Sequence, residues 1–303
     1  MSVILFIDAN QYLELYGLIK GKRLLDSLEE QKDHIFVSMQ IVDEVLRRKL
    51  GCAQFFFTNK LKEVSAIEAP VPDHLLGITE QKINEFRTIF EEAKKAREAL
   101  TQHATDALIQ ISRSQDEVSV RLEAIFDKAL SPTTEQVQRA RERKERGNPP
   151  GERTNPLGDQ LVWEQLLTHC KDTKCTGLWI ITRDSDFGIT WKGQFLLNSL
   201  LYRDLTKVCG AGLRIQCFSN LLTGLEDFGK NAGVKAEKLP TEKEAEEIRK
   251  EFEGLPPIGW MEGMRAMDEA NMVAIKAAVL RQQNRAAIDA GSNWPPNLPL
   301  LHS

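Results

Sequence analysis

The sequence predicts an α/β fold in which helices cover both faces of a central parallel sheet. Two observations support this prediction. Residues 3–7 and 177–182 are continuous apolar runs rich in branched side chains, as in strands buried on both faces. Strand and helix patterns also alternate along the N-terminal part of the chain, which is typical of parallel strands joined by helices. The expected architecture is therefore a three-layer α/β/α arrangement.

The N-terminal elements follow this alternation. The strand at 3–7 is followed by a helical pattern with a break marked by Gly17 and Gly21. Residues 34–37 are expected to form a second short strand, and Ser38 is placed to cap the helix that comes next.

A helical insertion is expected at about residues 79–146. Between 83 and 111, apolar residues recur in alternating steps of three and four, the pattern of an amphipathic helix of coiled-coil type. The stretch at 118–129 repeats this pattern. We expect the two stretches to form a helical hairpin, which can bury its own apolar stripe.

The α/β pattern resumes after a Pro/Gly loop at 147–151, with the buried strand at 177–182 and a last strand at 213–218. We expect one domain at residues 1–228 and a helical C-terminal extension at 229–303. In this extension Thr241 and Glu244 form a capping-box pattern, and a second helix is expected at 262–288.

Charge and composition limit the possible functions. The 303 residues carry a formal net charge of −4, so binding of nucleic acid would need a local basic patch. The five cysteines lack the spacing of zinc ligands, which favours buried thiols in a reducing cytosol. Apolar runs are too short for a membrane span, and the opening run is too short for a signal peptide. We expect a soluble, cytoplasmic protein.

Acidic side chains fall where the expected strands end or the following helices begin. Asp8 directly follows the first strand, and Asp184 and Asp186 directly follow a later one. Glu44 lies in the first turns of the helix after the second strand, and Asp159 starts another helix. Ligands of open parallel sheets bind beyond the carboxyl ends of the strands, so these acids can converge although they are far apart in sequence.

Converging carboxylates repel one another and would not all stay ionised without a cation between them. Oxygen-only ligand sets suit Mg²⁺ or Mn²⁺. A hydrated divalent ion can lower the pKa of an attacking water and neutralise charge on a phosphate. The acids therefore predict metal-dependent phosphodiester hydrolysis.

Four short motifs in this order resemble the PIN-domain family. They are Asp-Ala-Asn at 8–10, Val-Asp-Glu-Val at 42–45, Gly-Asp-Gln-Leu-Val-Trp at 158–163 and Ile-Thr-Arg-Asp-Ser-Asp-Phe at 181–187. The Asn-Pro-Pro-Gly loop at 148–151 further resembles a bacterial PIN-like subgroup with a long insertion. The resemblance covers roughly residues 1–60 and 145–225 and leaves the helical insertion and the C-terminal extension unmatched.

The resemblance implies a PIN-like fold and metal-dependent endonucleolytic cleavage of single-stranded RNA. It implies that Asp8, Glu44, Asp159 and Asp184 are catalytic and bind Mg²⁺ or Mn²⁺. Asp186 would be a further ligand or would support one. Which of the last two aspartates touches the metal stays open.

Four residues are candidates for substrate binding. By the resemblance, Asn10 would orient the neighbouring acid or bind substrate. Arg183, beside the acids, is expected to contact a phosphate or to neutralise the carboxylates. Arg143 and Lys144 belong to a basic segment that could grip phosphates. Interleaved glutamates make a solvated helix face an equally good interpretation of that segment.

Each acid also has an ordinary structural interpretation. Asp8 and Asp159 could be helix caps or first-turn acids, and Glu44 could form a surface ion pair. Asp184 and Asp186 could belong to a plain turn. Together these interpretations require unrelated coincidences at one sheet edge, which favours a functional site.

The alternative function is a catalytically inactive PIN-like scaffold that binds RNA or a protein. The insertion or the C-terminal helices would then contact a protein partner or a second copy of the chain. A haloacid-type phosphatase is disfavoured because Asn10 stands where its signature needs a second aspartate. A phosphoacceptor receiver would be far shorter. Toxin, phage-defence and RNA-processing roles all fit a ribonuclease.

Overall fold

The computed structural model describes residues 2–65, 80–151 and 157–254. Its central sheet contains parallel strands in the order β2–β1–β3–β6. They are β1 (Ser2–Ile7), β2 (Ile35–Phe36), β3 (Cys175–Ile181) and β6 (Arg214–Phe218). The apolar runs at the first and third of these strands are almost fully buried, as their continuous hydrophobic patterns predict.

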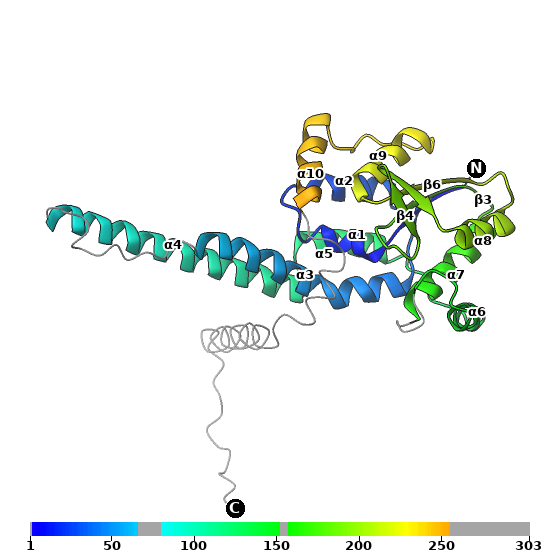
Figure 1. The fold of residues 1–303 in the computed structure, drawn as a ribbon, viewed down its shortest axis with the longest axis horizontal. Helices are drawn as coiled ribbons and strands as arrows, with labels where there is room; N and C mark the ends of the chain where they lie inside the picture. Colours follow the sequence, from blue (N-terminus) through cyan, green and yellow to red (C-terminus); the bar gives the residue numbers. More distant parts are fainter. Residues whose placement is uncertain (1, 66–79, 152–156, 255–303) are drawn as a thin grey trace, which may run out of the picture.

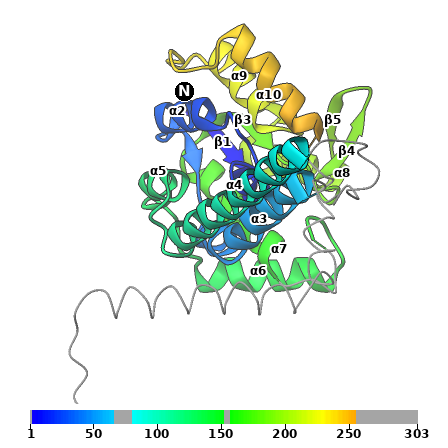
Figure 2. The same cartoon turned by 90° about the vertical axis from the view of Figure 1, so that its left-hand side faces the viewer.

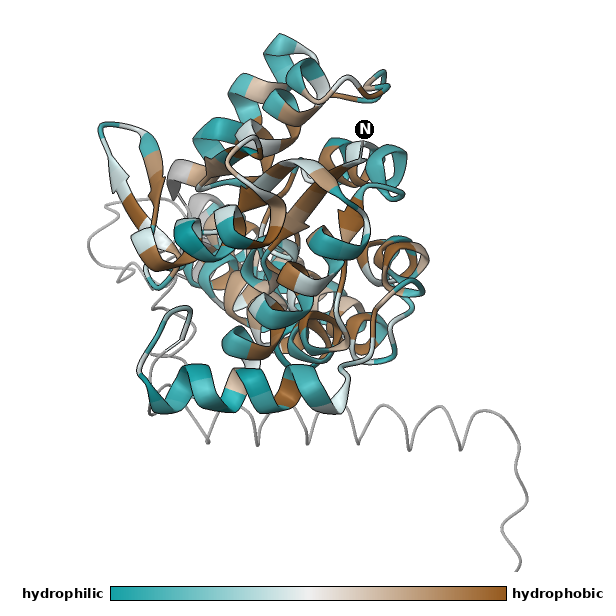
Figure 3. Cartoon of the chain, turned by 90° about the vertical axis from the view of Figure 1, so that its right-hand side faces the viewer, coloured by the Kyte–Doolittle hydropathy of each residue, from teal (hydrophilic) through white to brown (hydrophobic). Residues whose placement is uncertain are grey.

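Helices cover both faces of this sheet, which confirms the expected three-layer architecture (Figure 1). One face is covered by α2 (Lys22–Gln31), α9 (Leu221–Asn231) and α10 (Glu242–Gly254). The opposite layer contains α3 (Met39–Ser65), α7 (Gly158–Asp172), α6 (Thr134–Glu145) and α8 (Ser199–Cys209) (Figure 2). In the hydropathy view, hydrophobic ribbon gathers in the sheet, whereas the outer helices carry more hydrophilic ribbon (Figure 3).

The order of the strands places a reversal of sheet growth between β1 and β3. The chain first adds β2 on one side of β1 and later adds β3 on the other side, so the direction of sheet growth reverses there. Such reversal points are where open α/β sheets bind ligands, outside the carboxyl ends of the strands. The hydrogen bonding between β1 and β3 continues to the carboxyl ends of these strands, because the backbone N–H of Asp8 donates to the carbonyl of Ile181 at 3.0 Å.

The long helical hairpin is made by α3 and α4 (Glu80–Ser112), which run side by side away from the body (Figure 1). The expected pairing of the 83–111 helix with the stretch at 118–129 is wrong. That stretch forms α5 (Glu117–Phe126), which docks on α2, where Arg121 donates to Asp26 and Glu29 at 2.6 Å. The apolar periodicity predicted that a face is buried but did not identify its partner.

A small antiparallel hairpin follows the acidic loop and was not predicted. Its strands are β4 (Gly188–Trp191) and β5 (Gln194–Leu197). The turn between them consists of Lys192 and Gly193, both with positive φ (48° and 79°). Such turns are usually signalled by Asn-Gly or Asp-Gly, so Lys-Gly gave a weaker sequence signal.

The C-terminal part of the described chain packs back onto the domain. The capping box is confirmed, because the Thr241 backbone N–H donates to Glu244 at 2.9 Å at the start of α10. The backbone N–H groups of Ile19 and Lys20 donate to Glu251, which fixes α10 near the end of α1 (Ala9–Glu14). The helix expected at 262–288 lies outside the described residues. Among the described helices, none combines the length and hydropathy of a membrane span.

Candidate metal and active site

Asp8 and the loop after β3 are joined through one hydroxyl group. The Thr182 Oγ1 donates to Asp8 Oδ2 at 2.9 Å and accepts from the Asp184 backbone N–H at 3.0 Å. Asp8 occupies the N-cap position of α1, but its described side-chain bond goes to Thr182 and not to the helix backbone. The helix-cap interpretation of Asp8 therefore explains its position in the chain but not the direction of its carboxylate.

Asp184 and Asp186 are held by a tight turn anchored in the core. The Asp186 backbone N–H donates to Asp184 Oδ1 at 2.8 Å. The next residue, Phe187, is buried, with its ring 5.7 Å from that of Phe6 and 6.0 Å from that of Trp163. This packing ties the acidic turn to both the sheet and α7.

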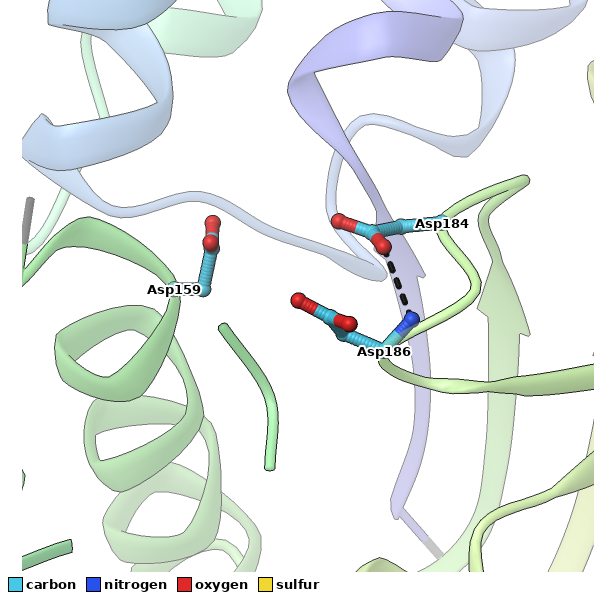
Figure 4. Close-up of side chains that lie close together, drawn as sticks. All are labelled: Asp159, Asp184 and Asp186. Atoms are coloured by element: carbon cyan, nitrogen blue, oxygen red, sulfur yellow. Dashed lines mark hydrogen bonds between the residues drawn. The ribbon is translucent and has the colours of Figure 1, made fainter. Parts of the chain in front are cut away.

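The aspartates of this turn face Asp159, which projects from the first turn of α7 (Figure 4). Carboxylate oxygens of Asp159, Asp184 and Asp186 all lie within 4.8 Å of one another. Asp159 is not the cap of its helix, since the N-cap position is Leu157. The fold thus brings this acid of α7 together with the two acids after β3, whereas Asp8 and Glu44 are not members of this close group.

Glu44 lies on α3 and acts on the same cluster electrostatically. Its charge raises the pKa of both Asp8 and Asp159. Its Oε1 also accepts a hydrogen bond from Arg48 at 2.6 Å, so the ion-pair interpretation of Glu44 is correct as well. Arg48 in turn lowers the pKa of Asp159, so this arginine offsets part of the negative charge of the cluster.

Burial and mutual repulsion disfavour ionisation at this site. Burial raises the pKa of Asp8 well above its ordinary value, and the charges of Asp184, Glu44 and Asp159 raise it further. The pKa of Asp159 rises to about 7, again mainly through burial and then through Asp184 and Glu44. A cation placed among these oxygens would reverse the effect.

The residues present fit a divalent cation of the Mg²⁺ or Mn²⁺ type. The donors are carboxylate oxygens, which such ions prefer, and those of Asp159, Asp184 and Asp186 lie close enough to share one ion. Nearby buried amides offer further polar atoms. Asn10 Oδ1 and both amide atoms of Gln160 are buried with no hydrogen-bond partner among the described residues. Buried polar atoms normally have partners, so these atoms favour a polar ligand or ordered water beside the acids.

The structure does not support a role in substrate binding for Arg183. Its Nε donates to the Ser219 carbonyl at 2.9 Å, and its guanidinium forms an ion pair with Glu14 at 3.0 Å. The same group lies 5.5 Å from the ring centre of Phe252 on α10. The guanidinium is therefore used in joining α1, β6 and α10, although its backbone lies next to the acids.

Arg143 is likewise engaged within the protein. This side chain is only 10% exposed, and its guanidinium donates to Glu164, to Asp204 and to the Pro149 carbonyl. It links α6 to α7, α8 and the Pro/Gly loop, so we do not retain it as a phosphate contact. Lys144, its neighbour, lies in the last turn of α6 and is half-buried.

Replacing Arg143 with Ala is expected to destabilise the protein by about 3 kcal/mol, because it leaves a buried carboxylate at Glu164 without this partner. The affinity of the folded variant for RNA should stay unchanged. Thermal unfolding and RNA titration measure the two effects. Arg141→Ala, at an exposed position of the same helix, is the matched control and should affect stability little. A loss of RNA affinity with normal stability would contradict the structural role.

Sequence reasoning missed two residues of the site. Thr182 is the hydroxyl that connects Asp8 to the acidic turn, and Arg48 partly offsets the negative charge around Glu44. The signal for Thr182 was a polar residue between an apolar strand and Asp184. It was weak because threonine is also a common strand residue.

The fold and the acids define a class of α/β proteins with a carboxylate cluster at the end of a parallel sheet. A family model described as a PIN-like domain matches residues 4–187 of this chain. The chain therefore belongs to the PIN-like domain family and has a nuclease-type fold. Searches of the curated proteins and of the solved structures found no significant match.

Proposed function

We propose that this protein is a metal-dependent endoribonuclease that hydrolyses phosphodiester bonds of single-stranded RNA. The observation that carries the proposal is the mutual approach of Asp159, Asp184 and Asp186 to within 4.8 Å at the end of the sheet. PIN domains are generally nucleases that use divalent metals. That the substrate of this protein is single-stranded RNA is part of our proposal.

In this proposal Asp8, Glu44, Asp159 and Asp184 hold Mg²⁺ or Mn²⁺, with Asp186 as a further ligand. When bound, such an ion lowers the pKa of an attacking water and neutralises charge on the phosphate. The protein orients the acids. Thr182 fixes Asp8 relative to the turn, and the buried ring of Phe187 fixes the turn relative to α7.

Two buried amide groups would add to the polar environment. Asn10 lies two residues after Asp8, and Gln160 directly follows Asp159. Their unpaired amide atoms can bind the hydration shell of the ion or an oxygen of the substrate. We also propose that residues 1–228 form the nuclease domain and residues 229–303 an extension of it.

Cleavage of a labelled single-stranded RNA tests the proposal. We expect internal cuts with Mg²⁺ or Mn²⁺ and none with EDTA. Calorimetry should show binding of Mn²⁺ by the full chain, weakened when Asp184 is replaced by Asn. RNA binding without metal binding or cleavage would contradict the proposal and favour the inactive scaffold.

A further inference from the structure

The β4–β5 hairpin displays an exposed apolar face beside the acid cluster. Ile189 and Trp191 are both 63% exposed, and Leu196 is 42% exposed. Ile189 pairs with Leu196 and Trp191 with Gln194 across the two strands, so all four side chains share one face. Exposed apolar groups gathered on one face commonly mark a binding surface.

The base of this hairpin is fixed to the core. On its other face Phe195 is buried, and Phe187 at its start packs between β1 and α7. A Cβ at Gly188 would lie 2.1 Å from the Leu196 carbonyl oxygen, so glycine allows the close approach of the strands. The Asn198 backbone N–H closes the base by donating to the Phe187 carbonyl at 2.8 Å. The exposed face therefore has a defined position relative to the acidic turn.

The base of the hairpin adjoins the acidic turn of the proposed active site. Asp186 precedes β4 by two residues. The three residue-to-residue steps from Gly188 to Trp191 span about 10 Å. A strand of RNA with one phosphate at the acids can therefore extend its next bases along the hairpin. In Figure 3 the hairpin is the two-stranded element that stands apart from the helical body.

The charges of this region also suit nucleic acid. The Lys192 Nζ lies 5.9 Å from the centre of the Trp191 ring, so a cation and an aromatic face are presented together. Arg203 and Lys207 on the following α8 are exposed. Asp204 lies between these two residues on α8, but its negative charge is paired with Arg143 at 2.6 Å. These exposed cations contrast with the net charge of −4 of the whole chain.

We propose that the exposed face of the hairpin is a stacking platform for single-stranded RNA, with Trp191 stacking on a base and Lys192 contacting the backbone. The proposal rests on the proposed function, because it takes the RNA substrate from there. Aromatic side chains next to basic groups are how proteins bind single strands without strict sequence preference, since every base has a π-face.

Anisotropy titrations of the full chain in EDTA, where metal-dependent cleavage is absent, test the platform. The probes are a labelled oligouridine strand and an abasic strand of the same length. Trp191→Ala should weaken binding of oligouridine by about tenfold or more and leave binding of the abasic strand unchanged. Trp191→Phe should retain most of the affinity because it keeps a ring.

Lys192→Ala should weaken binding of both oligonucleotides. It should also lower the magnitude of the slope of log affinity against log salt concentration by about 0.7. Ile89→Ala is the matched control, since Ile89 is 64% exposed on α4 and should not affect RNA binding. Equal affinities of wild type and Trp191→Ala for oligouridine would overturn the platform. The platform would also be overturned if Trp191→Ala formed a smaller oligomer than the wild type and kept the same affinity for RNA. That result would identify the hairpin face as a protein interface.

The two proposals can fail separately. Metal-dependent cleavage with RNA binding that is indifferent to Trp191 removes the platform alone. Loss of base-dependent binding in Trp191→Ala, in a protein that cleaves no RNA with any metal, removes the nuclease proposal and supports the platform.

Discussion

Replacing Asp8 with Asn is expected to lower the rate of RNA cleavage by on the order of 100- to 1000-fold, the effect of losing one group that stabilises charge in a transition state. Asn keeps the shape of the side chain and can still accept the hydrogen bond from Thr182. It lacks the negative charge that binds a divalent ion. The loss should therefore appear in activity and metal binding and not in folding.

Cleavage kinetics with Mg²⁺, together with Mn²⁺ calorimetry and thermal unfolding, measure these effects. Asp43→Asn is the control, because Asp43 is an exposed acid next to Glu44 and the substitution removes the same charge. It should cleave like the wild type. Normal cleavage by Asp8→Asn would mean that the acid cluster is not the catalytic centre.

Replacing Asp159 with Asn is expected to stabilise the metal-free protein at pH 8 by about 1–3 kcal/mol. The pKa of Asp159 in the folded protein is about 7, compared with an ordinary value of 3.8. The folded state therefore holds this proton more firmly than the unfolded state does. The protonated Asp159 therefore contributes stability that is fully present below about pH 4. This contribution is lost as the pH rises to about 7, because the buried carboxyl group must then ionise. Asn removes that cost.

Binding of a divalent metal ion should make the wild type more stable than Asp159→Asn, the reverse of the order expected without metal. A divalent ion that binds only the folded protein stabilises it, by about 2.7 kcal/mol at a concentration 100 times its Kd. The wild type should gain this stability and Asp159→Asn much less of it. Thermal unfolding with EDTA and with Mn²⁺, at pH 4.5 and at pH 8, measures both effects.

Asp172→Asn, at the exposed end of the same helix, is the control and should change neither value. Two results would each count against an acid cluster that needs a cation. One is a lower stability of metal-free Asp159→Asn at pH 8. The other is an equal gain from Mn²⁺ in both proteins.

Some features of this protein follow from its sequence alone. Continuous apolar runs identified the strands of a parallel sheet, and acids directly after those runs predicted a group of acids at one edge, where Asp184 and Asp186 meet Asp159. Such inferences succeed because they use short segments and one general property of parallel sheets, that their carboxyl ends share an edge. The capping box at Thr241 is equally local.

Other features depend on which side chains meet in three dimensions. Arg183 and Arg143 have the sequence positions of phosphate contacts, yet Glu14 and Glu164 from other helices pair with them. The apolar stripe of α4 was visible in the sequence, but its partner α3 was not. A long cationic side chain can reach several partners, and an amphipathic stripe fits any apolar surface.

The sequence by itself determined the α/β class and predicted acids at one sheet edge, of which Asp159, Asp184 and Asp186 lie together in the structure. Only the tertiary structure decided that Thr182 links Asp8 to the acidic turn, and that Trp191 is exposed on the hairpin that follows this turn. The physical reason is that strand and helix patterns are written in neighbouring residues, whereas hydrogen-bond partners and exposure are set by contacts between distant parts of the chain.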